Sequence, residues 1–240
     1  MGKLPGLSTP VVPPNFTPAR PIVYLDASWV LRERDAIYHD LQTLTDDGLR
    51  LTPGGEVYSN GRGGVRLPVG TRLLRGVQHP DRRTFIIQAA TMWPMARIND
   101  TDKSRIDVEL NLEAYHFFTK SGVEVIVSVE RAPTYIVLAH ELVHAYHLLR
   151  NSTKGGSEEH HFFDDEQQEF HQTVDLEELA TCGMLVRGNA PISENAVRQE
   201  HALRNRKSYA SLTEDLEVQG VRPVGQQPTW WPRYPRDWLR

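Results

Sequence analysis

The chain has 240 residues, 27 basic and 31 acidic, and a formal net charge of -4. This balance predicts no strongly basic surface, so we expect neither a nucleic acid nor an anionic membrane as the main partner. Cys182 is the only cysteine, which excludes an internal disulfide framework. There is no apolar run of about 18 residues and no apolar signal-peptide core, so we expect neither membrane insertion nor a secretory signal peptide.

The N-terminal segment, residues 1–21, is rich in Pro, Ser, Thr and Gly. This composition is typical of a flexible leader, which would suit a secretion signal. We expect residues 22–240 to form a single domain. Within it, apolar residues recur at helical spacing between residues 27 and 44, which predicts an amphipathic helix. The next segment, residues 46–64, is dense in Gly, Asp and Asn and is predicted to form turns.

Three strands are predicted next, at residues 83–89, 105–112 and 122–129, and the last two alternate with the period of a half-buried sheet. Pro133 then suits the first turn of a helix that runs to about Leu149. A polar segment, residues 151–173, leads to a second predicted helix at residues 175–186. The expected fold is therefore α+β. A small, twisted, mostly antiparallel sheet should pack on the helix at 133–149, and the C-terminal part should be helical.

The helix at 133–149 contains the sequence VLAHELVHAYHLL, which matches the pattern H-E-x-x-H. Residues four apart lie on the same helix face, so His140 and His144 can direct two imidazoles at one point. This is the geometry of two ligands of a single Zn2+ ion. Glu141 beside them is placed to act as general base on a zinc-activated water, as in zinc peptidases.

A catalytic zinc site needs a third protein ligand and an open position. The glutamate pair Glu177 and Glu178 at the start of the second helix can supply it, and the other member of the pair would orient a histidine. The spacing alone does not choose between them. His147 suits an orienting role better than ligation, because the longer zinc pattern with a Gly and a third His is absent. The remaining histidines of the polar segment, which we expect to be solvated, are His160, His161 and His171.

These motifs carry a resemblance. HELVHAYH followed by EELATCG resembles the zinc site of clostridial neurotoxin light chains. A longer match, which also includes ISENAVRQEHALRNRKSY, makes residues 133–209 similar to the NleD-like, HopH-like and XopG-like type III secreted effectors, peptidase family M91. The resemblance implies a zincin-like fold and one Zn2+ per chain, with Glu178 as third ligand and Glu177 as the alternate. It also implies injection into the host cell cytoplasm and cleavage of a host protein, in some relatives a mitogen-activated protein kinase.

The last motif should supply a donor for the oxyanion that forms in peptide hydrolysis. We favour Tyr209 together with Arg204. Arg198 stands four residues after Glu194, and we expect it to orient its neighbours, as Glu177 and His147 would. The expected protein is a monomeric zinc endopeptidase. The alternatives are a zinc-stabilised binding module without peptidase activity and, less favoured, a hydrolase with Cys182 as nucleophile.

Overall fold

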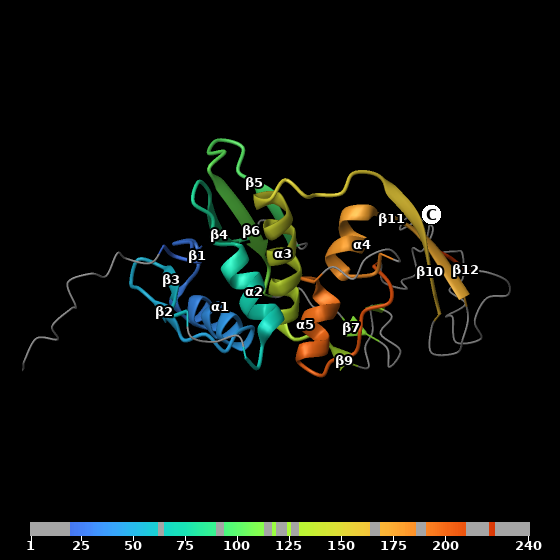
Figure 1. Cartoon of the computed structure of the whole chain (residues 1–240), viewed down its shortest axis with the longest axis horizontal. Helices are drawn as coiled ribbons and strands as arrows, with labels where there is room; N and C mark the ends of the chain where they lie inside the picture. The colour runs from blue at the N-terminus through green and yellow to red at the C-terminus, as the bar shows by residue number, and fades with distance from the viewer. Residues whose placement is uncertain are drawn as a thin grey trace, which may run out of the picture.

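The computed structural model describes residues 20–61, 65–89, 94–112, 117–118, 124–125, 130–163, 169–185, 191–209 and 221–223. These residues form an α+β fold with five helices and a six-stranded mixed sheet (Figure 1). The expected leader falls outside the described residues except for its last two positions. No helix in the described part of the chain is long and apolar enough to cross a membrane.

The main sheet has the strand order β2-β3-β1-β4-β6-β5. Its strands are β1 (Val23–Leu25), β2 (Leu49–Leu51), β3 (Glu56–Ser59), β4 (Arg83–Gln88), β5 (Met95–Ile98) and β6 (Arg105–Leu110). Three of its five strand pairings are antiparallel, as predicted for most of the sheet, but β4 at the centre runs parallel to both β1 and β6. The outer strands β2, β3 and β5 are antiparallel to their neighbours. The chain between β1 and β4 includes two helices, as parallel neighbours require a long crossover.

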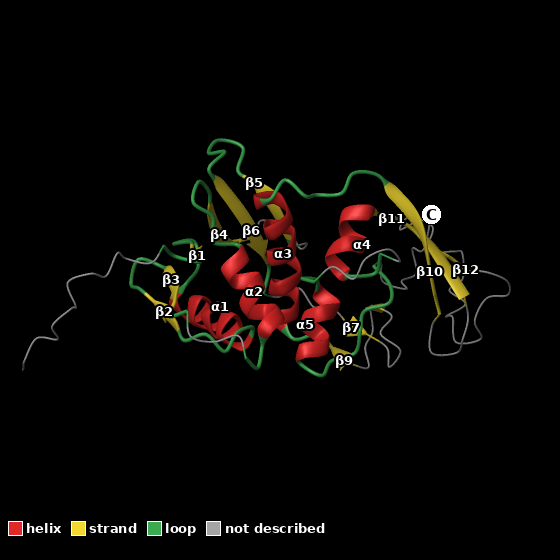
Figure 2. Cartoon of the chain, viewed as in Figure 1, coloured by secondary structure: helices red, strands yellow, loops and turns green. Residues whose placement is uncertain are grey.

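Three helices cover one face of this sheet, as Figure 2 shows: α1 (Leu31–Thr43), α2 (Pro68–Gly76) and α3 (Thr134–Leu149). Of these helices, α3 packs on β5 and β6 and contacts both α1 and α2. The sheet contributes Ile86, Ile106 and Val108 to the shared core, all fully buried. Because α3 is surrounded in this way, its polar side chains are held in a buried setting.

The rest of the described chain is partly helical, with α4 (Leu176–Cys182) and α5 (Glu194–Glu200). The sequence predicts a polar loop at 151–173 and a helical C-terminal part. Both predictions are wrong for β10 (Ser157–Phe163) and β11 (Glu169–Asp175), which form an antiparallel hairpin. β12 (Val221–Pro223) pairs with β11. One face of the hairpin buries Phe162, Phe170 and Val174, which is why this polar segment forms strands. The β10–β11 hairpin lies at the opposite end of the molecule from β2 and β3 (Figure 1).

The other predicted elements are mostly present. The helices at 27–44, 133–149 and 175–186 correspond to α1, α3 and α4, and two predicted strands correspond to β4 and β6. Of the strand predicted at 122–129, only β8 (Glu124–Val125) is described, in a small sheet with β7 (Phe117–Phe118) and β9 (Glu130–Arg131). The prediction of turns at 46–64 is wrong, because β2 and β3 form a hairpin there.

Candidate metal centre

The middle of α3 carries His140, Glu141 and His144, all buried, with 8%, 4% and 9% of their surface exposed. The helical spacing brings the two imidazoles together as predicted, with 3.2 Å between the two Nε2 atoms. Two imidazole nitrogens this close in a buried setting need a shared partner, because burial of unpaired polar atoms is costly.

Glu178, in the first turn of α4, reaches the same point. Its Oε2 lies 3.3 Å from Nε2 of His140 and 3.1 Å from Nε2 of His144. The short helix is fixed at its far end by Gly183, whose φ of 77° is the left-handed conformation of a glycine C-cap. Two imidazole nitrogens and one carboxylate oxygen thus converge, and this donor set suits a zinc ion.

The second nitrogen of each imidazole is held by another carboxylate. Nδ1 of His140 donates to Oε2 of Glu194 at 2.9 Å, and Nδ1 of His144 donates to Oε1 of Glu177 at 3.2 Å. A hydrogen on each Nδ1 leaves the lone pair on each Nε2, directed at the converging oxygen of Glu178. Carboxylates in this position fix the tautomer of metal-binding histidines.

Glu177 contacts Nδ1 of His144 and lies away from the converging Nε2 atoms. Besides His144, its carboxylate accepts hydrogen bonds from Nδ1 of His147 at 2.7 Å and from the backbone N–H of Lys154 at 2.8 Å. The buried hydroxyl of Thr181 donates to it at 3.4 Å. Of the glutamate pair, Glu178 is therefore the member at the converging nitrogens, and Glu177 ties α4 to the end of α3.

Glu194, at the start of α5, is buried and held by two guanidinium groups. Nε of Arg198 donates to it at 2.6 Å and Nη1 of Arg206 at 3.2 Å. Asn195 fixes Arg206 by bonding both its backbone N–H and its carbonyl. The contact between Arg198 and Glu194 agrees with their spacing of four residues on one helix. The contacts of Glu194 with His140 and Arg206 do not follow from local spacing and were not predicted.

The charges of this cluster stabilise one another. Burial lowers the pKa of His144, but its hydrogen bonds to Glu177 and Glu178 outweigh this and raise the pKa to about 9. Burial raises the pKa of Glu177, but the bonds from His144 and His147 outweigh it and lower the pKa to about 2. The pKa of Glu178 is also lowered. The carboxylates are thus ionised at neutral pH, as metal binding requires, whereas a metal ion has to displace the proton that His144 holds in the metal-free chain.

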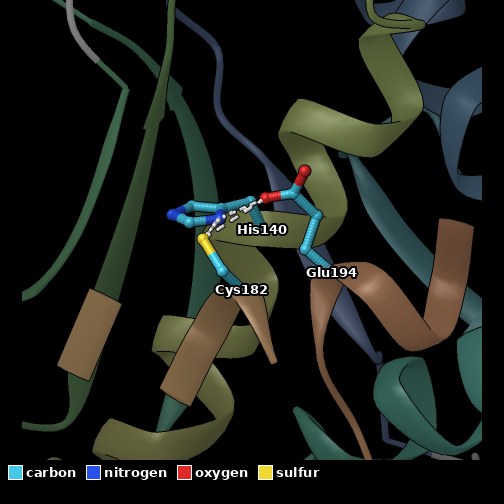
Figure 3. A group of neighbouring side chains, drawn as sticks. All are labelled: His140, Cys182 and Glu194. Atoms are coloured by element: carbon cyan, nitrogen blue, oxygen red, sulfur yellow. Dashed lines mark hydrogen bonds and ion pairs between the residues drawn. The ribbon is translucent and has the colours of Figure 1, made fainter. Parts of the chain in front are cut away.

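A second group of possible metal ligands shares His140 and adds Cys182 and Glu194 (Figure 3). The thiol sulfur lies 3.9 Å from Nδ1 of His140 and 3.8 Å from Oε2 of Glu194. Figure 3 shows both partners on the Nδ1 side of the ring, away from Nε2. The Glu194 carboxylate is already compensated by two arginines, and burial raises the pKa of the Cys182 thiol. This setting favours a neutral thiol in the core over a metal ligand or a nucleophile.

Tyr209 interacts electrostatically with residues of the candidate centre, whereas the side chain of Arg204 points to solvent. The phenol of Tyr209 has a raised pKa, chiefly through burial, with a further contribution from the Glu178 carboxylate and an opposing one from His140. The side chain of Arg204 is exposed. The arginine next to Tyr209 is Arg206, whose guanidinium carbon lies 5.2 Å from the centre of the tyrosine ring.

The family comparison agrees with the position of this cluster. A family model described as an effector protein, peptidase M91, matches residues 67–209. The chain belongs to the peptidase M91 family of effector proteins. Every residue of the cluster lies inside the matched range, so the resemblance seen in the sequence is confirmed at the level of the family. No curated protein and no solved structure matches the chain.

Proposed function

We propose that this M91 effector is a zinc-dependent endopeptidase with a zincin-like site. A type III secretion system would deliver it to the host cytoplasm, where it would cut a host protein as a monomer. The observation that carries the proposal is that Nε2 of His140, Nε2 of His144 and Oε2 of Glu178 lie within 3.3 Å of one another. The two carboxylates on the far nitrogens support it, because this arrangement prepares imidazoles to bind metal.

Under this proposal His140, His144 and Glu178 hold the zinc ion. When bound, zinc supplies Lewis-acid chemistry towards the scissile carbonyl and lowers the pKa of a water molecule. Glu141, one residue from the first ligand, takes the proton of the attacking water as general base and delivers it to the leaving amine. Glu177, Glu194 and Arg198 keep the imidazoles oriented.

Tyr209 is the proposed donor to the oxyanion that develops during peptide hydrolysis. Its raised pKa keeps the phenol protonated at neutral pH, as a hydrogen-bond donor must be. Arg206 positions the segment around it, because Nε of Arg206 donates to the carbonyl of Ser208 at 2.8 Å. The exposed Arg204 is better placed to meet a substrate than to stabilise the reacting atoms.

The proposed substrate is a host protein, since the chain belongs to a family of effectors. Mitogen-activated protein kinases are the first candidates to test, on the resemblance described above. A proteome-derived peptide library cleaved by the zinc-loaded chain would identify the cleavage site without this assumption. Cleavage should stop with a zinc chelator and continue with a thiol reagent. The opposite result would favour a nucleophilic Cys182.

The decisive variant is Glu141→Gln. It should retain zinc, measured by elemental analysis, and lose cleavage by several orders of magnitude, because the base is removed and the ligands remain. Glu158→Gln, which changes an exposed glutamate, is the matched control and should keep full activity. Zinc binding without cleavage in the unmodified chain, over a broad library, would favour the alternative of a zinc-stabilised binding module.

A further inference from the structure

The β10–β11 hairpin has two chemically different faces. In its register His161 stands opposite His171, Glu159 opposite Thr173, and Phe163 opposite Glu169. Alternate residues of a strand point to the same side, so these six side chains share one face. The other face carries the buried Phe162, Phe170 and Val174. These three buried side chains account for the packing of the hairpin, whereas His161 and His171 lie on the more exposed face.

The ionisable groups of the outer face lie close to one another. The rings of His161 and His171 lie with their centres 5.5 Å apart. Nδ1 of His161 donates to Glu169 at 3.1 Å, and Nδ1 of His171 donates to Glu159. Glu159, His161 and His171 each offer one possible ligand atom, and these three atoms all lie within 4.8 Å of one another. Two imidazoles and a carboxylate are therefore close enough to share one ion.

We propose that this outer face is a second metal site, separate from the centre on α3 and α4, which takes a divalent transition ion such as Zn2+. Directly opposite residues of an antiparallel pair have Cβ atoms about 5 Å apart, so a cross-strand histidine pair can chelate one ion. Imidazole with carboxylate suits zinc, copper and nickel and does not suit calcium or magnesium. Glu169 on Nδ1 of His161 directs the lone pair of that ring to Nε2, as an orienting carboxylate does.

An ion at this site would link β10 to β11 beyond their backbone ladder. β11 ends at Asp175, and α4 with Glu178 begins at the next residue. The inner face of the same hairpin holds the segment of Tyr209, through the backbone N–H of Tyr209 donating to Gln172 at 3.3 Å. The outer ion would thus brace the strands between α3 and α4 and leave the catalytic groups unchanged.

The test compares the full chain with the double variant His161→Asn/His171→Asn at buffered free zinc. At saturation the unmodified chain should bind one zinc ion more per chain than the variant, measured by elemental analysis. The readout is a difference between two proteins with the same α3, so it does not depend on whether the proposed peptidase centre binds zinc. His39→Asn, which removes an exposed histidine of α1, is the control and should bind as much as the unmodified chain.

Amide hydrogen exchange gives a second readout. Added zinc should slow exchange in residues 157–163 and 169–175 more strongly in the unmodified chain than in the double variant, because the centre on α3 and α4 is present in both proteins. Equal zinc content in the two proteins would overturn the proposal, as would exchange rates in the hairpin that do not respond to zinc.

Discussion

At the scale of single residues, the centre on α3 is defined by which nitrogen each carboxylate contacts. Glu178 stands at the Nε2 side of both imidazoles, while Glu177 and Glu194 stand at the Nδ1 side. A buried charge is tolerated when it is paired and hydrogen-bonded, and each of these carboxylates has such partners. The three glutamates therefore have different expected effects on metal binding, although all three contact a histidine.

Substitution of the two adjacent glutamates should separate a ligand from an orienting group. Glu178→Gln removes the charged oxygen at the converging nitrogens and should abolish both zinc retention and cleavage. Glu177→Gln keeps an acceptor for Nδ1 of His144, so zinc affinity should fall by only about 10- to 100-fold. Zinc competition with a chromophoric chelator measures both. The reverse order of effects would assign the ligand role to Glu177.

Tyr209→Phe removes one hydroxyl and keeps the ring in place. If the phenol stabilises the oxyanion, kcat should fall by about 10²- to 10³-fold, as for other single oxyanion donors. Zinc content and thermal stability should be unchanged, because the ring contact with Arg206 remains. Arg204→Gln is the comparison on the same segment and should alter KM more than kcat. A Tyr209→Phe enzyme with normal kcat would exclude this role.

His201, at the end of α5, predicts a pH dependence of stability away from the centre. Burial lowers its pKa from 6.5, and Glu200 opposes this shift in part. Its Nε2 is buried without a hydrogen-bond partner among the described residues. The folded state thus binds its proton at lower pH than the unfolded state, so this part of the stability is complete above pH 6.5 and is lost as the pH falls below it.

The measurement is the free energy of unfolding against pH for the unmodified chain and His201→Gln, with His39→Gln as a control. The fall in stability below pH 6.5 should be shallower for His201→Gln, because glutamine takes up no proton. The control should follow the unmodified chain. Parallel curves for all three proteins would show that burial of His201 does not oppose its protonation.

At the scale of elements, α2 depends on a residue far away in the sequence. It begins at Pro68, and the N-cap residue Leu67 offers no side-chain hydrogen bond. Its first-turn N–H groups instead donate to the Glu200 carboxylate, Val69 at 2.6 Å and Gly70 at 2.9 Å. A Cβ on Gly70 would lie 1.8 Å from the carbonyl oxygen of Leu44, so glycine is required where α2 meets the end of α1. An anion at a helix N-terminus is favoured by the unpaired N–H groups and by the helix dipole.

Glu200→Ala should therefore lower the free energy of unfolding by about 1–2 kcal/mol, as the loss of an N-cap does, although the residue belongs to α5. Glu200→Gln should cost less, because its amide oxygen still accepts one bond. Glu33, whose bond to the N–H of Val30 is 3.4 Å long and exposed, is the control, and Glu33→Ala should cost below about 0.5 kcal/mol. Denaturant unfolding measures all three, and equal effects at positions 33 and 200 would contradict the cap.

The same dependence on distant contacts explains which elements the sequence could predict. α1 was predictable because Ile37, Leu41 and Leu44 recur at helical spacing and are fully buried. The pair of His140 and His144 was predictable for the same reason, since both residues lie on one helix. α2 carries no cap of its own and was missed. The β10–β11 hairpin was missed because its outer face is polar, so its composition resembles that of a loop.

The site was predictable to the same extent. Glu178 was nominated through the family resemblance, and spacing alone left Glu177 open. Glu194 lies 54 residues from His140, and only the packing of α5 against α3 brings them together. The sequence pointed to Arg204 and not to Arg206, because both arginines stand in the same polar segment. They differ in burial, which the sequence does not show: Arg206 is buried and Arg204 is exposed. Local periodicity identifies residues of one helix, and tertiary contacts decide the rest.

At the scale of the whole molecule, the candidate centre joins two parts of the chain. His140 and His144 belong to the helix packed on the main sheet, whereas Glu178 follows the hairpin at the other end of the molecule (Figure 1). A bound metal would therefore link α4 and the hairpin to the core. An ion that binds only the folded chain adds to its stability in proportion to the logarithm of its free concentration over Kd.

Zinc should accordingly raise the free energy of unfolding by about 4 kcal/mol at a free concentration a thousandfold above Kd. For a chain of this size that corresponds to a rise in Tm of about 10 °C. The test uses the His161→Asn/His171→Asn chain, so that zinc at the hairpin does not contribute. In this background, the further substitution Glu141→Gln should keep the zinc-dependent rise in Tm. The further substitution His144→Asn should remove it. A Tm that does not respond to zinc, or an equal rise in both variants, would mean that the three converging donors do not hold the ion.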